Sequence, residues 1–93
     1  MKFMLTWNLP HGTYKEAVNR FLSTGAPLPA GVKSLGRWHS VDERIGFHLV
    51  ETSDGVALMQ HAAEWKDLLD ISVCPVLDDA EAGEAVSRVF KKK

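Results

Sequence analysis

The chain has 93 residues, 45% of them hydrophobic, and carries a formal net charge of −1 with acidic and basic side chains interspersed. This length allows a single domain, residues 1–93, and the near-neutral charge gives no field that would attract nucleic acid or an anionic membrane. The one cysteine, Cys74, excludes an internal disulfide framework. With no signal peptide pattern at the N-terminus, these features predict a cytoplasmic protein.

The first predicted elements are a strand and a helix. Residues 2–8 alternate apolar and polar side chains, which is the pattern of a strand. Thr13 and Glu16 have the spacing of a capping box, so a helix is predicted from this point to about Thr24. Gly25 suits the left-handed position that closes such a helix. A proline-rich, extended connection follows.

Residues 32–39 and 45–51 predict two strands joined by a polar turn. We expect His39 to pair with Arg44 across this hairpin. That register places His39 and His48 about 13 Å apart, so one chain cannot hold a metal ion with both. No metal is therefore predicted.

The second half of the chain predicts a further helix and strand. Ser53 can cap a helix over residues 54–68. Residues 70–77 predict a strand at the edge of the sheet, because Pro75 cannot donate to a neighbouring strand. Residues 78–93 are expected to form a C-terminal helix with its apolar side chains inward, followed by a basic tail.

The element order predicts the fold class. Strand, helix, strand, strand, helix, strand is the order of a ferredoxin-like α+β domain. Because each strand-helix-strand unit crosses over right-handedly, the four strands should form an antiparallel sheet in the order 4-1-3-2. The two main helices should cover one face of this sheet.

Side-chain alternation divides the predicted sheet into an apolar face and a mixed face. The apolar face, expected under the helices, contains Phe3, Leu5, Trp7, Val32, Trp38, Ile45, Phe47, Leu49, Ile71, Val73 and Leu77. The mixed face contains Met4, Thr6, Asn8, Leu35, Arg37, His39, His48, Val50, Ser72, Cys74 and Val76. The mixed face predicts a homodimer whose two sheets enclose a cavity. The alternative is a monomer whose C-terminal helix covers that face.

Six short segments carry a family resemblance. They are Met-Lys-Phe-Met-Leu-Thr-Trp7, Arg-Phe-Leu…Gly25-Ala-Pro27, Gly36-Arg-Trp-His39, Gly46-Phe-x-Leu-Val-Glu51, Glu64-Trp65-x-Asp67-Leu and Pro75-Val76. Together they resemble a family of uncharacterised bacterial proteins known only as a domain of unknown function, which is similar to the dimeric α+β barrel superfamily. The resemblance implies the same homodimer. It implies no single activity, since the superfamily includes cofactor-free monooxygenases, isomerases and haem-degrading enzymes.

Arg37, His39 and His48 share the mixed face with Thr6 and predict a site for a small planar or anionic ligand. Arg37 would hold a carboxylate by paired hydrogen bonds, and a histidine could move a proton near neutral pH. The alternative is that these residues rim a dimer interface and bond to the partner's backbone.

Trp7 and Trp65 are candidate walls of the same ligand site. The haem-degrading members are similar in placing an asparagine on the first strand and a tryptophan late in the second helix, which correspond to Asn8 and Trp65. No histidine follows His61 to serve as the iron ligand, so no cofactor is expected.

Three functions remain open on these grounds. The first is binding of a small planar or anionic ligand between the sheets of a homodimer. The second is a cofactor-independent monooxygenase or isomerase acting on an aromatic or keto compound, with His39, His48 and Asn8 as candidate catalytic residues. The third is a non-catalytic structural or regulatory dimer.

Overall fold

The computed structural model describes residues 1–91. Within them the chain forms β1 (Lys2–Asn8), α1 (Tyr14–Thr24), β2 (Lys33–His39), β3 (Ile45–Glu51), α2 (Gly55–Trp65), β4 (Asp70–Val76) and α3 (Asp79–Phe90). This order confirms the predicted sequence of elements. The predicted basic tail includes residues 92–93, which lie outside the described residues.

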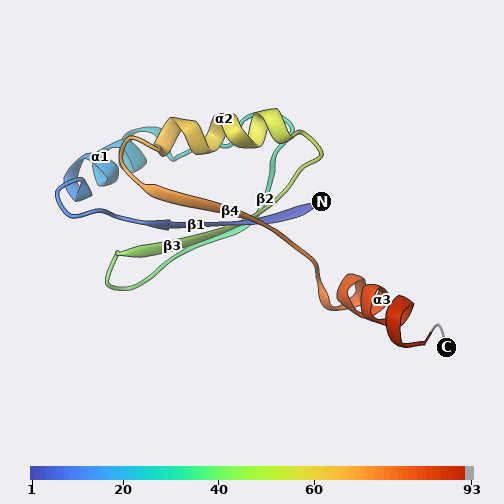
Figure 1. Cartoon of the computed structure of the whole chain (residues 1–93). Helices are drawn as coiled ribbons and strands as arrows, with labels where there is room; N and C mark the ends of the chain where they lie inside the picture. Colours follow the sequence, from blue (N-terminus) through green and yellow to red (C-terminus); the bar gives the residue numbers. More distant parts are fainter. Residues whose placement is uncertain (92–93) are drawn as a thin grey trace.

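The four strands form one antiparallel sheet in the order β2-β3-β1-β4. This is the predicted order read from the opposite edge, and it is consistent with a ferredoxin-like fold. The position of β4 at the edge of the sheet is also confirmed. An edge strand tolerates Pro75, which has no N–H to donate to a neighbouring strand. Helices α1 and α2 both lie over the same face of the sheet (Figure 1). We call this the covered face, and the opposite side the open face.

Helix α1 begins after Thr13, but the predicted capping box is wrong. The Thr13 side chain caps no helical amide. Its hydroxyl instead donates to the backbone carbonyl oxygens of Leu68, at 2.9 Å, and Pro10, at 3.1 Å, and so ties the start of α1 to the segment after α2. The end of α1 is as predicted: Gly25 has φ 72°, and its N–H bonds to the carbonyl of Phe21 at 2.8 Å.

Helix α2 begins one residue later than expected, because Asp54 rather than Ser53 is its N-cap. The Asp54 carboxylate accepts from the Ala57 amide at 3.0 Å, which satisfies one of the free N–H groups of the first turn. The helix ends at Trp65, three residues before the predicted limit, where the Trp65 carbonyl accepts from the amides of Leu68 and Leu69.

Helix α3 has the capping box that α1 lacks, formed by Asp78 and Glu81. The expectation that its apolar side chains point inward is wrong, since α3 has no buried residue and Phe90 is 74% exposed. The helix lies beyond the end of β4 and away from the sheet (Figure 1). The monomer alternative required this helix to cover the exposed face of the sheet. In the structure α3 does not cover the open face.

The register of the β2–β3 hairpin differs from the prediction by two residues. His39 pairs with Gly46, not Arg44, and Arg37 pairs with His48. The reason is the turn: the Ser40 N–H bonds to the carbonyl of Ile45 at 2.8 Å, and the Ser40 hydroxyl accepts from the Ile45 amide at 3.0 Å. These bonds pair Ser40 with Ile45, so the turn lies one residue further along the chain than predicted, at residues 41–44.

The pairing of β1 with β3 overturns the predicted composition of the two faces. Leu5 pairs with His48, and Trp7 pairs with Gly46, so the apolar side chains of β1 share the covered face with Arg37 and His48. Trp38, Phe47 and Leu49 instead lie on the open face with Met4 and Thr6, because Met4 pairs with Leu49 and Thr6 with Phe47. A strand's own alternation shows which residues share a side, whereas the pairing decides how the sides of two strands combine.

Two core clusters lie between the helices and the sheet. The first consists of Leu5, Val32, Val50, Ala57 and Leu58, with Phe3 and Leu28 packed against it. The second consists of Ala17, Ala26, Trp65, Leu68 and Leu69, with Trp7, Leu9, Phe21 and Ile71 packed against it. Each cluster joins a helix to the covered face, which holds the helices in place above the sheet.

Candidate functional site

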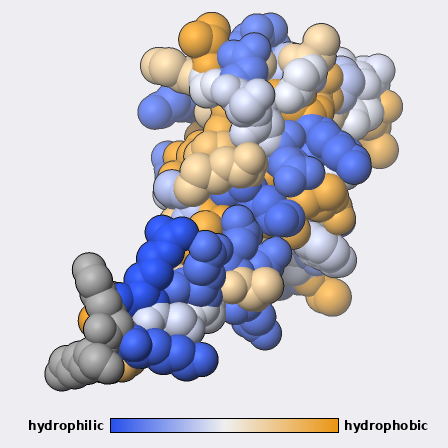
Figure 2. All heavy atoms as spheres, turned by 90° about the vertical axis from the view of Figure 1, so that its right-hand side faces the viewer, coloured by the Kyte–Doolittle hydropathy of each residue, from blue (hydrophilic) through white to orange (hydrophobic). Residues whose placement is uncertain are grey.

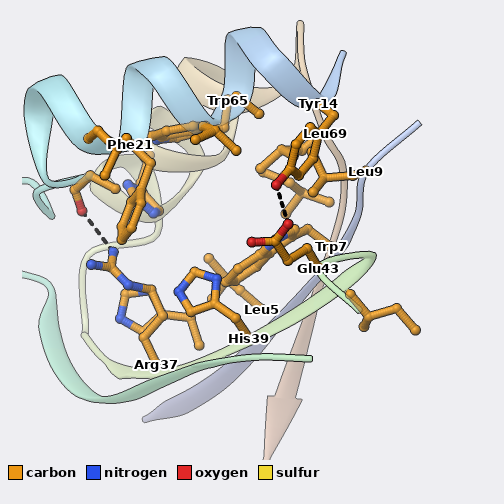
Figure 3. Close-up of a pocket in the computed structure, with 18 residues that line it drawn as sticks. Leu5, Trp7, Leu9, Tyr14, Phe21, Arg37, His39, Glu43, Trp65 and Leu69 are labelled. Atoms are coloured by element: carbon orange, nitrogen blue, oxygen red, sulfur yellow. Dashed lines mark hydrogen bonds between the residues drawn. The ribbon is translucent and has the colours of Figure 1, made fainter. Parts of the chain in front are cut away.

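A cavity of about 320 Å³ lies between α1, α2 and the covered face (Figure 3). Its volume is at the lower end of the range found for small-molecule sites. Four aromatic side chains line it: Trp7, Tyr14, Phe21 and Trp65. Besides Tyr14, five residues with ionisable side chains line it: Arg37, His39, Glu43, His48 and His61. A mainly apolar cavity with a few polar groups is the usual form of a ligand pocket.

Gly46 provides the space at the floor of the pocket. It is the β3 residue between Trp7 on β1 and His39 on β2, and it pairs with both. A Cβ atom at Gly46 would lie 1.8 Å from the Trp7 indole ring, so the ring occupies the place of the missing side chain. The Trp7 and His39 rings meet nearly edge to face, with their centroids 5.7 Å apart. The Trp7 and His39 rings, with Gly46 between them, thus form a floor of the pocket that spans β1, β3 and β2.

The Arg37 side chain connects β2 to the end of α1. Its guanidinium donates to the carbonyl oxygens of Ala26, at 3.0 Å, and Gly25, at 3.2 Å, and lies over the Phe21 ring with Cζ 5.2 Å from the centroid (Figure 3). A cation is favourable here, since the carbonyl end of a helix carries partial negative charge. Within residues 1–91, no carboxylate forms a salt bridge with Arg37.

His48 and His61 are buried polar side chains at the pocket, 2% and 6% exposed. Their rings lie edge to face with centroids 6.2 Å apart. Burial, together with the smaller effect of the positive charge of Arg37, lowers the pKa of His48 to about 4. Burial likewise lowers the pKa of His61, against a smaller opposing effect of Glu64. Both imidazoles are therefore uncharged at neutral pH.

The two buried histidines differ in their hydrogen bonds. Nε2 of His48 is bonded to the Ser34 hydroxyl at 2.9 Å. Nδ1 of His61 is buried and has no hydrogen-bond partner among the described residues. Buried polar atoms without partners are rare in folded proteins and call for an explanation.

Tyr14 and Glu43 connect two elements at the rim of the pocket. The Tyr14 hydroxyl, at the start of α1, donates to the carboxylate of Glu43 in the β2–β3 turn (Figure 3). This hydrogen bond raises the pKa of Tyr14. Both residues are exposed, and Glu43 has a positive φ of 63°. The bond therefore closes one side of the pocket without burying charge.

Most of the predicted ligand-binding residues line this one pocket: Trp7, Arg37, His39, His48 and Trp65. Their predicted location between two facing sheets is wrong, because the pocket lies within a single chain. Thr6 and Asn8 are not part of it, since Thr6 pairs with Phe47 on the open face and Asn8 lies two residues further along the same side of β1.

The sequence prediction missed His61, Phe21 and Tyr14 as pocket residues. A signal for His61 was present, because it lies four residues before Trp65 and therefore on the same face of α2.

Neither a metal cluster nor a membrane-spanning helix is found in the part of the chain that the structure describes. No group of three His, Cys, Asp or Glu side chains among these residues could hold a metal ion. No helix within residues 1–91 is long and apolar enough to cross a membrane.

A family model described as a domain of unknown function, DUF3303, matches residues 1–90. The chain belongs to the DUF3303 family. This membership agrees with the resemblance to a domain of unknown function and assigns no activity. No curated protein and no solved structure gives a significant match to the chain. The function of this DUF3303 protein must therefore be argued from its pocket.

Proposed function

We propose that this DUF3303 protein binds a small planar molecule in the pocket between α1, α2 and the sheet. The observation that carries the proposal is the cavity of about 320 Å³, whose walls are aromatic and whose polar groups converge from β2, β3 and α2. Flat rings such as those of Trp7, Phe21 and Trp65 favour stacking with a planar ligand. The size suits a molecule of a few fused rings at most.

A variant whose larger side chain fills the cavity tests the proposed ligand binding. Val18 lines the cavity from α1, whereas its neighbour Asn19 is exposed and does not line it. We expect bicyclic aromatic probes to change the tryptophan fluorescence of the wild type, and Val18→Phe to reduce their affinity at least about tenfold by occupying the cavity. Asn19→Phe, the matched control, should bind as the wild type does. Equal binding by both variants would place the ligand elsewhere.

An enzyme that uses the same pocket is the second candidate. The uncharged imidazoles of His48 and His61 are suited to accept a proton from a substrate, which favours a cofactor-independent monooxygenase or isomerase acting on an aromatic or keto compound. Turnover of such compounds by metal-free protein, lost in His61→Phe and kept in the exposed variant His11→Gln, is the expected result for an enzyme. Binding without turnover supports the ligand-binding function alone.

We also propose a homodimer of the dimeric α+β barrel type, in which two open faces meet. The chain exposes 6696 Å², roughly a quarter more than the about 5,350 Å² expected for a compact monomer of its mass. Its radius of gyration is 15.9 Å, against about 12 Å for a compact domain of this length. On the open face, Trp38 is 55% and Phe47 41% exposed. Both values include α3, which has no buried residue and lies away from the sheet (Figure 1), so the exposed rings of the open face are the observation that favours an interface there.

The space-filling view shows hydrophobic residues at the surface among hydrophilic ones (Figure 2). Sedimentation at micromolar concentration should give twice the mass of the chain. Phe47→Lys should yield a monomer, because a charge would be buried at the interface. Met59→Lys, at an exposed position on α2, should leave the dimer intact. A monomeric wild type would overturn this proposal. We also propose the cytoplasmic setting that the sequence predicted, since a single cysteine gives the chain no internal disulfide to form.

A further inference from the structure

Three of the four basic side chains that line the pocket come from three different elements: Arg37 of β2, His48 of β3 and His61 of α2. We call them the basic cluster. Arg37 and His48 are direct cross-strand neighbours, and the His48 and His61 rings are 6.2 Å apart between centroids. Among the described residues, no carboxylate forms a salt bridge with any of the three. The cluster therefore has one positive charge and two uncharged imidazoles.

His61 has capacity for a hydrogen bond that the protein does not use. Its Nδ1 is buried and forms no hydrogen bond within residues 1–91, and the side chain as a whole is only 6% exposed. A half-turn of the ring exchanges its two edges, so either nitrogen can face the pocket. By contrast, Nε2 of His48 is already held by Ser34. His61 is thus the member of the cluster left to pair with a ligand.

The chemistry of the cluster selects a class of ligand. A neutral imidazole offers an acceptor nitrogen, which requires a donor, and the nearby guanidinium favours negative charge. A carboxylate is already ionised at neutral pH and has no proton to give, so it would satisfy Arg37 but leave the acceptor unpaired. A hydroxyl that is weakly acidic satisfies both requirements, because it can give its proton to the imidazole and keep the charge on oxygen.

We propose that the basic cluster takes up the hydroxyl of a planar phenol or enol and holds it as the oxyanion. The ligand O–H bond breaks, its proton forms an N–H bond on His61, and the negative oxygen faces Arg37. The net charge of the site does not change, and no oxidant or cofactor is needed. This inference rests on the proposed ligand-binding function, and it assigns His61 a role that the sequence did not suggest.

Other titratable groups surround the cluster and act on it. Glu64, on α2 itself, favours the protonated form of His61, whereas Arg37 disfavours it. Tyr14 of α1 and Glu43 of the β2–β3 turn line the same pocket but are bonded to each other at its rim. An oxyanion beside His61 adds a negative charge next to the imidazole, which stabilises the imidazolium that forms.

Three matched probes test the inference: 4-nitrophenol, 4-nitroanisole and 4-nitrobenzoate. Nitrophenol reports its own ionisation by absorbance, nitroanisole cannot ionise, and nitrobenzoate is a carboxylate. We expect the bound nitrophenol to have a pKa at least about one unit below that of the free probe, because a cation lies close to its oxygen. Near neutral pH it should bind more tightly than either of the other probes.

Variants of the cluster decide which residues are responsible. His61→Phe keeps a ring in place but removes the acceptor, so it should remove most of the absorbance shift while nitroanisole still binds. Arg37→Met should reduce the shift, and the exposed variant His11→Phe should retain it in full. If His61→Phe does not fold, the wild-type shift and its loss in Arg37→Met carry the test.

The outcomes separate the inference from the function on which it rests. Nitrophenol bound with an unshifted spectrum, or a full shift in His61→Phe, overturns the inference and leaves the ligand pocket standing. Tighter binding of nitrobenzoate than of nitrophenol also overturns it. Failure of all three probes to bind overturns the proposed function together with the inference.

Discussion

The covered and open faces of the sheet each carry side chains that were not expected on them, because the two sides of β2 and β3 are exchanged. The covered face buries His48, which is 2% exposed, and holds the charged side chain of Arg37. The open face presents the large apolar side chains of Trp38 and Phe47 to solvent. Buried polar groups and exposed apolar rings are the observations that carry information about function, because ordinary folding favours neither. The first marks the candidate ligand site and the second the proposed interface.

Truncation of neighbouring residues on β1 should show the largest difference between the faces. Leu5, 2% exposed, belongs to the first core cluster, whereas Met4 is half-buried on the open face. Leu5→Ala should lower the free energy of unfolding by about 3 kcal/mol, since it leaves a cavity in the core. Met4→Ala should cost less than about 1 kcal/mol. Urea denaturation at low protein concentration measures both, and equal costs would contradict this assignment of the faces.

Acid should lower the stability of the folded protein through His48, which is buried on the covered face. Its pKa is about 4 in the folded protein and near 6.5 when unfolded, so between these values only the unfolded chain takes up the proton. The resulting stability is complete above about pH 6.5 and is lost as the pH falls toward 4, by on the order of 3 kcal/mol. His48→Gln should remove this part of the pH dependence, and His11→Gln should not. Parallel profiles for the wild type and His48→Gln would count against a buried, uncharged His48.

A methyl group at Gly46 should disturb the floor of the pocket. The added Cβ would lie 1.8 Å from the Trp7 ring, which must then move. We expect Gly46→Ala to lower the free energy of unfolding by about 2 kcal/mol and to weaken the binding of aromatic probes. The control is Gly55→Ala at the start of α2, where nothing lies within 4 Å of the new Cβ. Thermal denaturation and probe titration of the two variants should differ clearly, and similar results would exclude close packing of Trp7 on Gly46.

The smallest effect is expected on α3, which covers neither face. Gly83 lies inside this helix, and a Cβ there would meet nothing within 4 Å. Gly83→Ala should favour the helix by up to about 1 kcal/mol and raise the helical signal in circular dichroism. It should not shift the unfolding midpoint of the sheet, because α3 has no buried residue. A shifted midpoint would show that α3 packs against the rest of the protein or against a second copy.

Much of the fold could be predicted because its signals are local. The alternation of residues 2–8 and 45–51 gave strands with the observed bounds, and Gly25 gave the end of α1. The predicted strand order followed from connection rules that hold for most sheets. The site was predicted in part for the same reason, since Arg37, His39 and His48 share one side of a hairpin under either register, which differ by two residues.

The location of the site could not be predicted in the same way. Hydrophobicity favoured burial of Trp38 and Phe47, but the pairing of Leu5 with His48 turned the other side of β2 and β3 toward the helices. A change of one residue in such a pairing exchanges the two sides of a strand completely. The spacing of His61 and Trp65 could place both on one face of α2, but the position of His61 beside His48 depends on contacts across the pocket.

Sequence alone determined which segments are strands and helices, and which side chains lie together on each of them, because these properties depend on neighbours within a few residues. Only the tertiary structure decided which side of each strand faces the helices. That choice is made by hydrogen bonds between β1 and β3, segments more than thirty positions apart, and by the room that Gly46 leaves for Trp7. It brought Arg37, His48 and His61 together in one pocket.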